Sequence, residues 1–329
     1  MDPTICLSPL HVDMHGDLKL RVGRPQGEEK SVKSFVVCSR ALARASPIFE
    51  EMLYGQVAEP THINRNSGVL DLPTHEPESF QLFALASHGL LHQVPRNLSL
   101  DQLYDLTTLT HSYDATKTLL PWIKSWTRLI GEPVSIIPMF KVLWVSWELG
   151  QRSAFEETAK RIVMECRGSI LAGDSALHAL QMPPGVVERV AKIRMETIGA
   201  LLEVFRDLIE ELVTANESSH VCRYGSFLTS NPCESMILGS VTIGLLRGGL
   251  WPIPSPDEVD WSIVEVYETL TNIIVYDFGQ ISTEDVDHGK CNPAILLREK
   301  ITGIFETVPS PVTNGQRKEL ETRTKLLYA

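Results

Sequence analysis

The chain begins with an alternation of apolar and polar positions. Leu18, Leu20 and Val22 are separated by polar neighbours, which is the pattern of a half-buried β-strand. The stretch GRPQGEEK supplies turn-forming residues, and SVKSFVV follows it, so these two segments are predicted to form a hairpin-like pair of strands. VLDLP predicts another short strand. A small sheet is therefore expected near the N-terminus.

The apolar period becomes helical from Ser39 onward. Leu42, Ala45, Phe49 and Met52 recur at helical spacing, and three more helical patterns follow between residues 76 and 130. The residues up to about 130 therefore predict a small domain of mixed α and β structure.

Helical patterns dominate the rest of the chain. A long amphipathic helix is predicted from Val186 to Val213, and two more helical patterns, MILGSVTIGLLRGG and WSIVEVYETLTNIIVY, lie between polar stretches. The last residues carry Pro, Gly and charges with little apolar periodicity, so we expect a mobile tail. The predicted organisation is an α+β domain over 14–130, a helical extension over 131–213, a helical domain over 214–307 and a tail over 308–329.

Composition narrows the possible partners. The 329 residues are 43% hydrophobic and carry a net charge of −11, which argues against a surface that binds nucleic acid through clustered Lys and Arg. No apolar run approaches the roughly 20 residues needed to cross a bilayer, and no membrane association is expected. The expected location is cytoplasmic or nuclear, where the six cysteines would be free or metal-bound rather than paired.

The first domain carries a recognisable set of motif residues. Gly16 and Asp17 precede the first strand, Phe35 lies in the second, and Leu42, Ser46 and Phe49 follow in the helical segment. This pattern, together with the order of elements over residues 14–126, resembles the BTB/POZ domain. The chain departs from that family at Cys38 and Ser39, where His and a basic residue are usual, and at His88–Gly89, where Tyr–Gly is usual.

The resemblance implies a function in protein binding. Such domains bind other proteins, often form homodimers through their N-terminal region and first helices, and in some cases dock onto cullin ubiquitin-ligase scaffolds. The helical block over 131–213 is expected to be either the extension that accompanies cullin docking or a helical domain that packs on itself. The departures from the family pattern put functions of a charged pocket, such as corepressor capture, in doubt.

A second group of residues indicates a metal site. Cys222 and Cys233 lie in one polar stretch, and His288 and Cys291 lie in another. Thiolates and imidazole are the ligands that zinc prefers, and four of them make a closed tetrahedral structural site. The group also resembles the C-terminal region of fungal BTB proteins. One structural zinc ion is therefore predicted at these four residues.

Two alternatives to this metal set remain open. The ten residues between Cys222 and Cys233 exceed the usual spacing of two to four, and His220 is a possible substitute for one of the ligands. The same residues are also compatible with separate loops that hold unreactive, buried thiols.

The sequence offers no catalytic pattern to compete with these interpretations. It has no Gly-rich phosphate loop, no Gly-x-Ser-x-Gly elbow and no His-Glu-x-x-His motif. We therefore expect a non-enzymatic scaffold or adaptor that acts through protein partners, with or without a cullin. The alternative is a zinc-dependent enzyme whose C-terminal metal keeps one open position.

Overall fold

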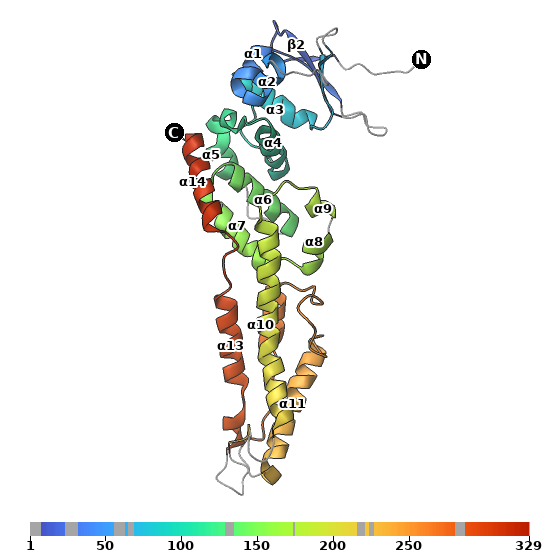
Figure 1. The fold of residues 1–329 in the computed structure, drawn as a ribbon, viewed down its shortest axis with the longest axis vertical. Helices are drawn as coiled ribbons and strands as arrows, with labels where there is room; N and C mark the ends of the chain where they lie inside the picture. Colours follow the sequence, from blue (N-terminus) through green and yellow to red (C-terminus); the bar gives the residue numbers. More distant parts are fainter. Residues whose placement is uncertain are drawn as a thin grey trace, which may run out of the picture. The chain divides into compact units, whose positions relative to one another are not determined.

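The computed structural model describes residues 8–23, 32–55, 63–64, 69–128, 135–173, 175–215, 221–223, 227–279 and 287–328. The chain divides into two compact units (Figure 1): unit 1 comprises residues 1–155 and 314–329, and unit 2 comprises residues 156–313. The predicted α+β, mostly helical organisation is confirmed. The predicted boundaries at 130, 213 and 307 differ from this division, because residues 135–155 and the C-terminal residues belong to the same unit as the N-terminal sheet.

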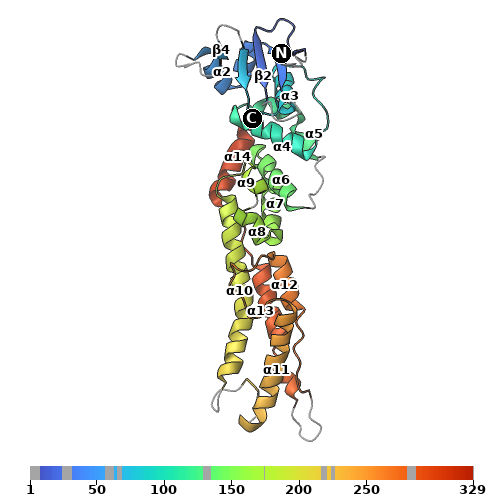
Figure 2. The same cartoon turned by 90° about the vertical axis from the view of Figure 1, so that its right-hand side faces the viewer.

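Unit 1 contains a five-stranded mixed sheet (Figure 2) in the order β1-β3-β2-β5-β4. The strands are β1 (Leu10–His11), β2 (Leu18–Val22), β3 (Lys33–Val37), β4 (Ile63–Asn64) and β5 (Val69–Leu72). β2 pairs with β3 in antiparallel register, with Leu20 opposite Phe35, and with β5 in parallel register. The two strands predicted as a pair and the short strand predicted at VLDLP are thus confirmed.

The helices of unit 1 provide the other side of its core. They are α1 (Ser39–Ala45), α2 (Pro47–Tyr54), α3 (Pro77–Ser87), α4 (Leu100–Ser112), the 3₁₀ helix η1 (Thr116–Leu119), α5 (Leu120–Arg128), α6 (Ile136–Glu148) and α14 (Asn314–Tyr328). The ring of Phe49 stacks on Tyr113 with centroids 4.3 Å apart, and lies 6.0 Å from the ring of Phe83. Phe35 approaches Phe80 at 5.4 Å. These buried rings join the sheet to three helices.

The helical segment from Ser39 to Tyr54 is broken at Ser46, so Leu42 and Phe49 do not share the single helix face that their helical spacing predicts. Ser46 adopts an extended conformation with φ −148° and ψ 120°, because the ring of Pro47 disfavours helical geometry in the preceding residue. The Ser46 hydroxyl accepts a hydrogen bond from the Phe49 N–H at 3.0 Å and donates one to the Tyr113 carbonyl. Leu42 and Phe49 are both fully buried, but on two helices.

Asp17 links the entrance of β2 to the start of α1. Its carboxylate accepts hydrogen bonds from the Ser39 hydroxyl at 2.6 Å and from the Ser39 N–H at 2.7 Å. Both bonds lower the pKa of Asp17, and the bond from the Ser39 hydroxyl has the larger effect. Asp17 therefore has a structural role here, and it satisfies one of the amide donors that a helix leaves free at its N-terminus.

The C-terminal residues form a packed helix, so the prediction of a mobile tail over 308–329 is wrong. α14 buries Gln316, Leu320 and Leu327. Arg323 of α14 donates a hydrogen bond at 2.7 Å to the buried carboxylate of Glu148 in α6, and its guanidinium lies 5.1 Å from the ring centroid of Trp147. α14 is therefore joined to α6 by a charged contact that lies largely out of water.

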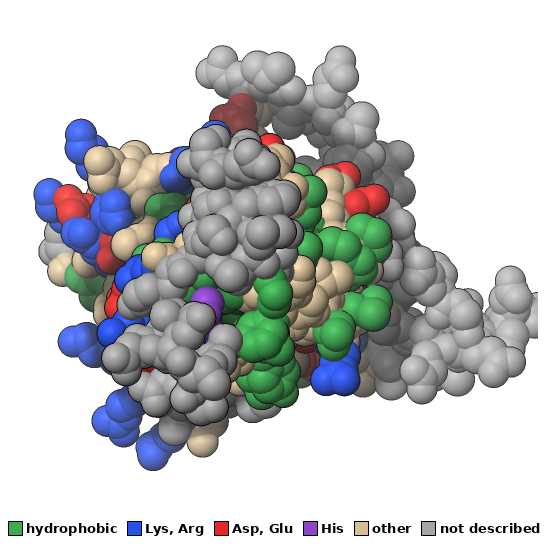
Figure 3. Space-filling view, turned by 90° about the horizontal axis from the view of Figure 1, so that it is seen from below, with side chains coloured by type: hydrophobic (Ala, Val, Ile, Leu, Met, Phe, Trp, Pro, Cys, Tyr) green, Lys and Arg blue, Asp and Glu red, His purple; other side chains and the backbone are tan. Residues whose placement is uncertain are grey.

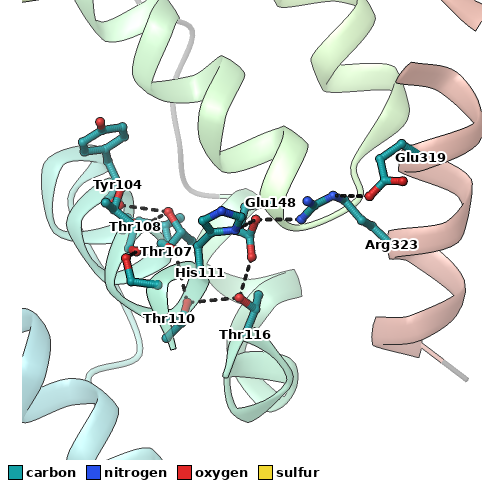
Figure 4. Close-up of polar contacts among 11 residues, drawn as sticks. Tyr104, Thr107, Thr108, Thr110, His111, Thr116, Glu148, Glu319 and Arg323 are labelled. Atoms are coloured by element: carbon teal, nitrogen blue, oxygen red, sulfur yellow. Dashed lines mark hydrogen bonds and ion pairs between the residues drawn. The ribbon is translucent and has the colours of Figure 1, made fainter. Parts of the chain in front are cut away.

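Glu148 gathers further partners around the same carboxylate (Figure 4). The Thr116 hydroxyl donates to one oxygen at 2.6 Å, and His111 Nδ1 lies 2.9 Å from the other. These side chains come from α4, η1, α6 and α14, so one buried acid connects four elements of unit 1. A buried carboxylate is stable only with such partners.

Unit 2 is built around one long helix. Its helices are α8 (Gly168–Gly173), α9 (Ser175–His178), α10 (Val186–Thr214), α11 (Phe227–Arg247), α12 (Ile263–Thr271), the 3₁₀ helix η2 (His288–Cys291) and α13 (Ala294–Glu306), while α7 (Arg152–Glu165) crosses the boundary between the units. α10 packs against α11, α12 and α13 through the apolar face that the sequence predicts. The helix predicted over 261–276 ends earlier, at Thr271. None of the helices in the described ranges is long and apolar enough to cross a membrane.

Candidate metal centre

Four residues that the sequence indicated as metal ligands come together in unit 2. Cys222, Cys233, His288 and Cys291 are all buried, and their ligand atoms lie within 4.8 Å of one another. Cys222 belongs to a short segment before α11, Cys233 lies in α11, and η2 supplies the other two. His220, the possible substitute ligand, lies outside the described residues. The structure thus assembles the predicted set from three separate segments.

The 3₁₀ geometry of η2 directs two ligands to one side. Side chains three residues apart eclipse in a 3₁₀ helix, so His288 and Cys291 project in the same direction. Asp287 caps this turn by accepting a hydrogen bond from the Gly289 N–H at 3.0 Å. The His288 N–H donates to the Gly279 carbonyl at 3.0 Å. The His-x-x-Cys spacing is therefore explained by a single capped turn.

Glu234 fixes the segment that carries Cys222. One of its carboxylate oxygens accepts hydrogen bonds from the Val221 N–H at 2.7 Å and the Cys222 N–H at 3.2 Å. Glu234 is buried and directly follows Cys233, so it ties the two cysteine segments together. Sequence reasoning missed this residue. Its position next to a predicted ligand was the available signal, but an acid in a polar stretch is usually solvent-exposed.

Two separations between ligand atoms are close to those of a tetrahedral zinc site. With Zn–S bonds of about 2.3 Å and Zn–N bonds of about 2.0 Å, two sulfurs lie about 3.8 Å apart and a sulfur and a nitrogen about 3.5 Å apart. Cys222 Sγ is 3.6 Å from His288 Nδ1 and 4.0 Å from Cys291 Sγ. The four groups therefore lie close enough together to hold one metal ion.

The electrostatics of the cluster favour a bound cation. Burial, reinforced by Cys222 and Cys291, raises the pKa of the Cys233 thiol to about 12. Three thiolates packed this closely would repel one another, and a divalent cation removes that penalty. The Arg223 N–H points at Cys291 Sγ at 3.4 Å, which is the kind of outer contact that stabilises sulfur ligands. Three sulfurs and one ring nitrogen are a donor set compatible with zinc.

The motif residues of unit 1 do not form a comparable cluster. Phe35, Leu42 and Phe49 are fully buried in the core, and Asp17 and Ser46 hold the ends of α1 and α2. Neither the scan against protein-family models nor the search of curated proteins finds a match to this chain. The description of the fold and of the candidate metal-ligand cluster therefore comes from the structure of this chain alone.

Proposed function

We propose that this chain is a non-enzymatic scaffold or adaptor, with a BTB/POZ-like interaction domain in unit 1 and one structural zinc ion in unit 2. The observation that carries the metal assignment is the set of Cys222, Cys233, His288 and Cys291, all buried and with ligand atoms within 4.8 Å of one another. Four protein ligands complete the coordination of zinc and leave no position for a reactive water. This argues for a structural ion and against the alternative of a zinc-dependent enzyme.

The interaction role is supported by the order of elements in unit 1. A mixed sheet, two short helices broken at Ser46, and the buried Leu42 and Phe49 fit the BTB/POZ-like pattern. Every motif residue has a role in packing or in hydrogen bonding, so none is left that requires a catalytic explanation. We propose protein partners in the cytoplasm or nucleus, with a homodimer or a cullin as specific candidates.

Metal analysis of the purified full-length protein tests the zinc assignment. We expect one zinc ion per chain, lost in Cys291→Ser and His288→Ala, because either change removes a ligand and leaves three. Cys166→Ser is the matched control, since Cys166 is another buried cysteine of unit 2 outside the cluster. Absence of metal, or metal retained by both ligand variants, would remove the zinc assignment.

Cobalt substitution separates the structural site from the enzymatic alternative. A Co²⁺ ion bound by three thiolates and one imidazole should give the intense visible bands of tetrahedral thiolate coordination, unchanged when small anions are added. A spectrum that shifts with added anions would indicate an exchangeable fourth position and favour the enzyme.

Sedimentation velocity and co-purification test the interaction role. A dimer that Tyr54→Ala weakens would support self-association through the first elements of unit 1, because Tyr54 is 54% exposed at the end of α2. Co-purification of a cullin would identify the adaptor function. A monomer with no specific protein partner would count against the interaction role as a whole.

A further inference from the structure

Unit 2 contains an apolar groove of 810 Å³ outside the metal cluster. One wall is α11, and the other consists of the end of α12 and the irregular segment that follows it. The lining residues are Ser235, Met236, Gly239, Ser240, Ile243, Gly244, Arg247, Gly248, Thr269, Asn272, Ile273, Ile274, Tyr276 and Asp277. The early end of α12 at Thr271 creates this second wall, because the residues that follow leave the helix.

The rim of the groove exposes large apolar side chains. Ile274 is 65% exposed, Tyr276 60% and Ile243 49%, and all three line the same groove. Single exposed apolar residues are ordinary, but a contiguous group along a groove marks an interaction site. Figure 3 views the molecule from below and shows a group of exposed hydrophobic side chains, with most of the Lys and Arg side chains along one edge of the view.

Glycines shape the α11 wall in two ways. A Cβ on Gly244 would meet Ile273 at 2.6 Å and one on Gly248 would meet Thr269 at 2.8 Å, so these glycines let the second wall pack closely on α11. A Cβ on Gly239 would meet no atom within 4 Å. Gly239 therefore leaves the floor of the groove open between Met236 and Ile243.

The metal cluster holds both walls. Cys233 lies in α11, two residues before the groove begins, and Asn292 directly follows the ligand Cys291. The Asn292 side chain donates hydrogen bonds to the Val275 carbonyl at 2.9 Å and to the Asp277 carboxylate at 2.7 Å. The groove is thus fixed by the folded structure before any partner binds, which lowers the entropic cost of binding.

Length and charge indicate what the groove accommodates. The α11 residues that line it run from Ser235 to Arg247, a rise of about 18 Å, which matches a little over three turns of a partner helix. Arg247 is exposed and has no ion pair or hydrogen bond in the described part of the chain, whereas the Asp277 carboxylate is occupied by Asn292 and the Gly279 N–H. Arg247 therefore offers an exposed positive charge in a groove whose other charged lining residue, Asp277, already accepts hydrogen bonds from Asn292 and Gly279.

We propose that this groove binds an amphipathic helix of a partner protein, with the apolar face of that helix over Gly239 and an acidic side chain beside Arg247. Helix-in-groove recognition uses apolar side chains at i, i+3, i+4 and i+7, and a preformed groove of this length accommodates such a face. The inference rests on the proposed interaction function, but it concerns unit 2 and needs no contact from the BTB/POZ-like elements.

A panel of fluorescent synthetic peptides tests the proposal on the full-length, metal-loaded protein. The probe is a helical peptide of about 16 residues with Leu at i, i+3, i+4 and i+7 and one Glu near either end. The matched peptides replace Glu by Lys or place two Pro residues in the helix. Fluorescence polarisation should give a Kd on the order of 10 µM for one Glu peptide, weaker binding of its Lys form and no binding of its Pro form.

Gly239→Leu is the decisive variant, because its side chain enters open space and Leu favours a helix more than Gly does. It should weaken peptide binding by about tenfold or more, since the new side chain fills the groove floor. Gly303→Leu is the matched control: Gly303 lies in α13, is exposed, and its Cβ would also meet no atom within 4 Å. Arg247→Glu should reverse the preference between the Glu and Lys peptides by about fivefold.

Several results would overturn the proposal. Failure of every Leu peptide to bind, equal binding by the Pro form, or binding unaffected by Gly239→Leu would each exclude a helix over this floor. Sedimentation velocity of the protein without peptide provides a further test. A dimer that Gly239→Leu abolishes would mean that a second copy of the chain, and not a partner protein, occupies the groove. Metal content and self-association through unit 1, measured on the same samples, show separately whether the proposed function holds.

Discussion

Replacing Arg323 by Met should loosen the C-terminal helix far more than the surface chemistry of that helix suggests. Arg323 is the cationic partner of Glu148, whose side chain is only 4% exposed, and the arginine itself is 21% exposed. Met keeps much of the aliphatic volume but removes the guanidinium. The buried carboxylate then retains only Thr116 and His111 as partners.

The magnitude follows from the burial of the pair. Removing one partner of a buried ion pair costs about 3–5 kcal/mol, because the remaining charge is left poorly solvated. The partial exposure of Arg323 and the two remaining partners of Glu148 favour the lower end, about 3 kcal/mol. This corresponds to a roughly 100-fold increase in the population in which α14 is detached.

Hydrogen exchange with mass-spectrometric detection measures this directly. Amides of residues 314–328 should exchange roughly 100-fold faster in Arg323→Met, within the range of local opening. Arg152→Ala is the matched control, because it breaks an ion pair to Glu321 of the same helix whose side chains are 48% and 52% exposed. That change should cost less than about 1 kcal/mol, or about fivefold in exchange.

The outcome that would refute this reasoning is equal exchange in the two variants. It would mean that the apolar face of α14, including Leu320, holds the helix without help from the charged contact. Adding Glu148→Gln to Arg323→Met provides an internal check, since it removes the unpaired charge and should recover part of the lost protection.

Two further predictions concern the core of unit 1. His88 Nε2 accepts the Cys38 N–H at 2.9 Å and Nδ1 lies 2.8 Å from the Ala84 carbonyl, which requires the neutral ring. Burial lowers the pKa of His88, so the stability that the neutral ring contributes should be present above pH ~6.5 and be lost as the pH falls further. Between pH 7.5 and 5.0, the urea midpoint of His88→Gln should therefore decline less steeply than that of the unchanged protein. Phe49→Ala should destabilise unit 1 by about 3–5 kcal/mol in urea unfolding, whereas its exposed neighbour, changed as Ile48→Ala, should have little effect; similar losses in both would contradict the packing argument.

The hydrophobic pattern of the sequence predicted the strands and helices that turn one regular apolar face toward the core. Leu18, Leu20 and Val22 alternate because one face of β2 meets the core, and the apolar face of α10 recurs at helical spacing for the same reason. The break at Ser46 was also readable, since Pro47 disfavours helical geometry in the residue before it. The same residues identify Ser46 as a cap and Pro47 as a helix start, and only the placement of Leu42 and Phe49 on one helix face was wrong.

Long-range contacts explain the failures. α14 has few apolar residues, and its attachment depends on Arg323 and Glu148, which are 175 positions apart. Nothing near Arg323 in the sequence indicates that it meets a buried acid. A long-range contact also explains why α12 ends at Thr271, earlier than predicted. The residues that follow pack on α11, with Ile273 against Gly244, instead of continuing the helix.

The metal centre lies between these two cases. The candidate ligands were predictable because Cys and His are the residues that zinc prefers, whatever loops they occupy. The wide spacing of Cys222 and Cys233 lacks the usual short knuckle, but Glu234 binds the backbone around Cys222 and holds the two segments together. Because Cys222 and His288 lie 66 residues apart, the ligand set forms only when unit 2 folds. The free energy of zinc binding, on the order of 10 kcal/mol for small structural sites, would therefore add to the folding of this unit.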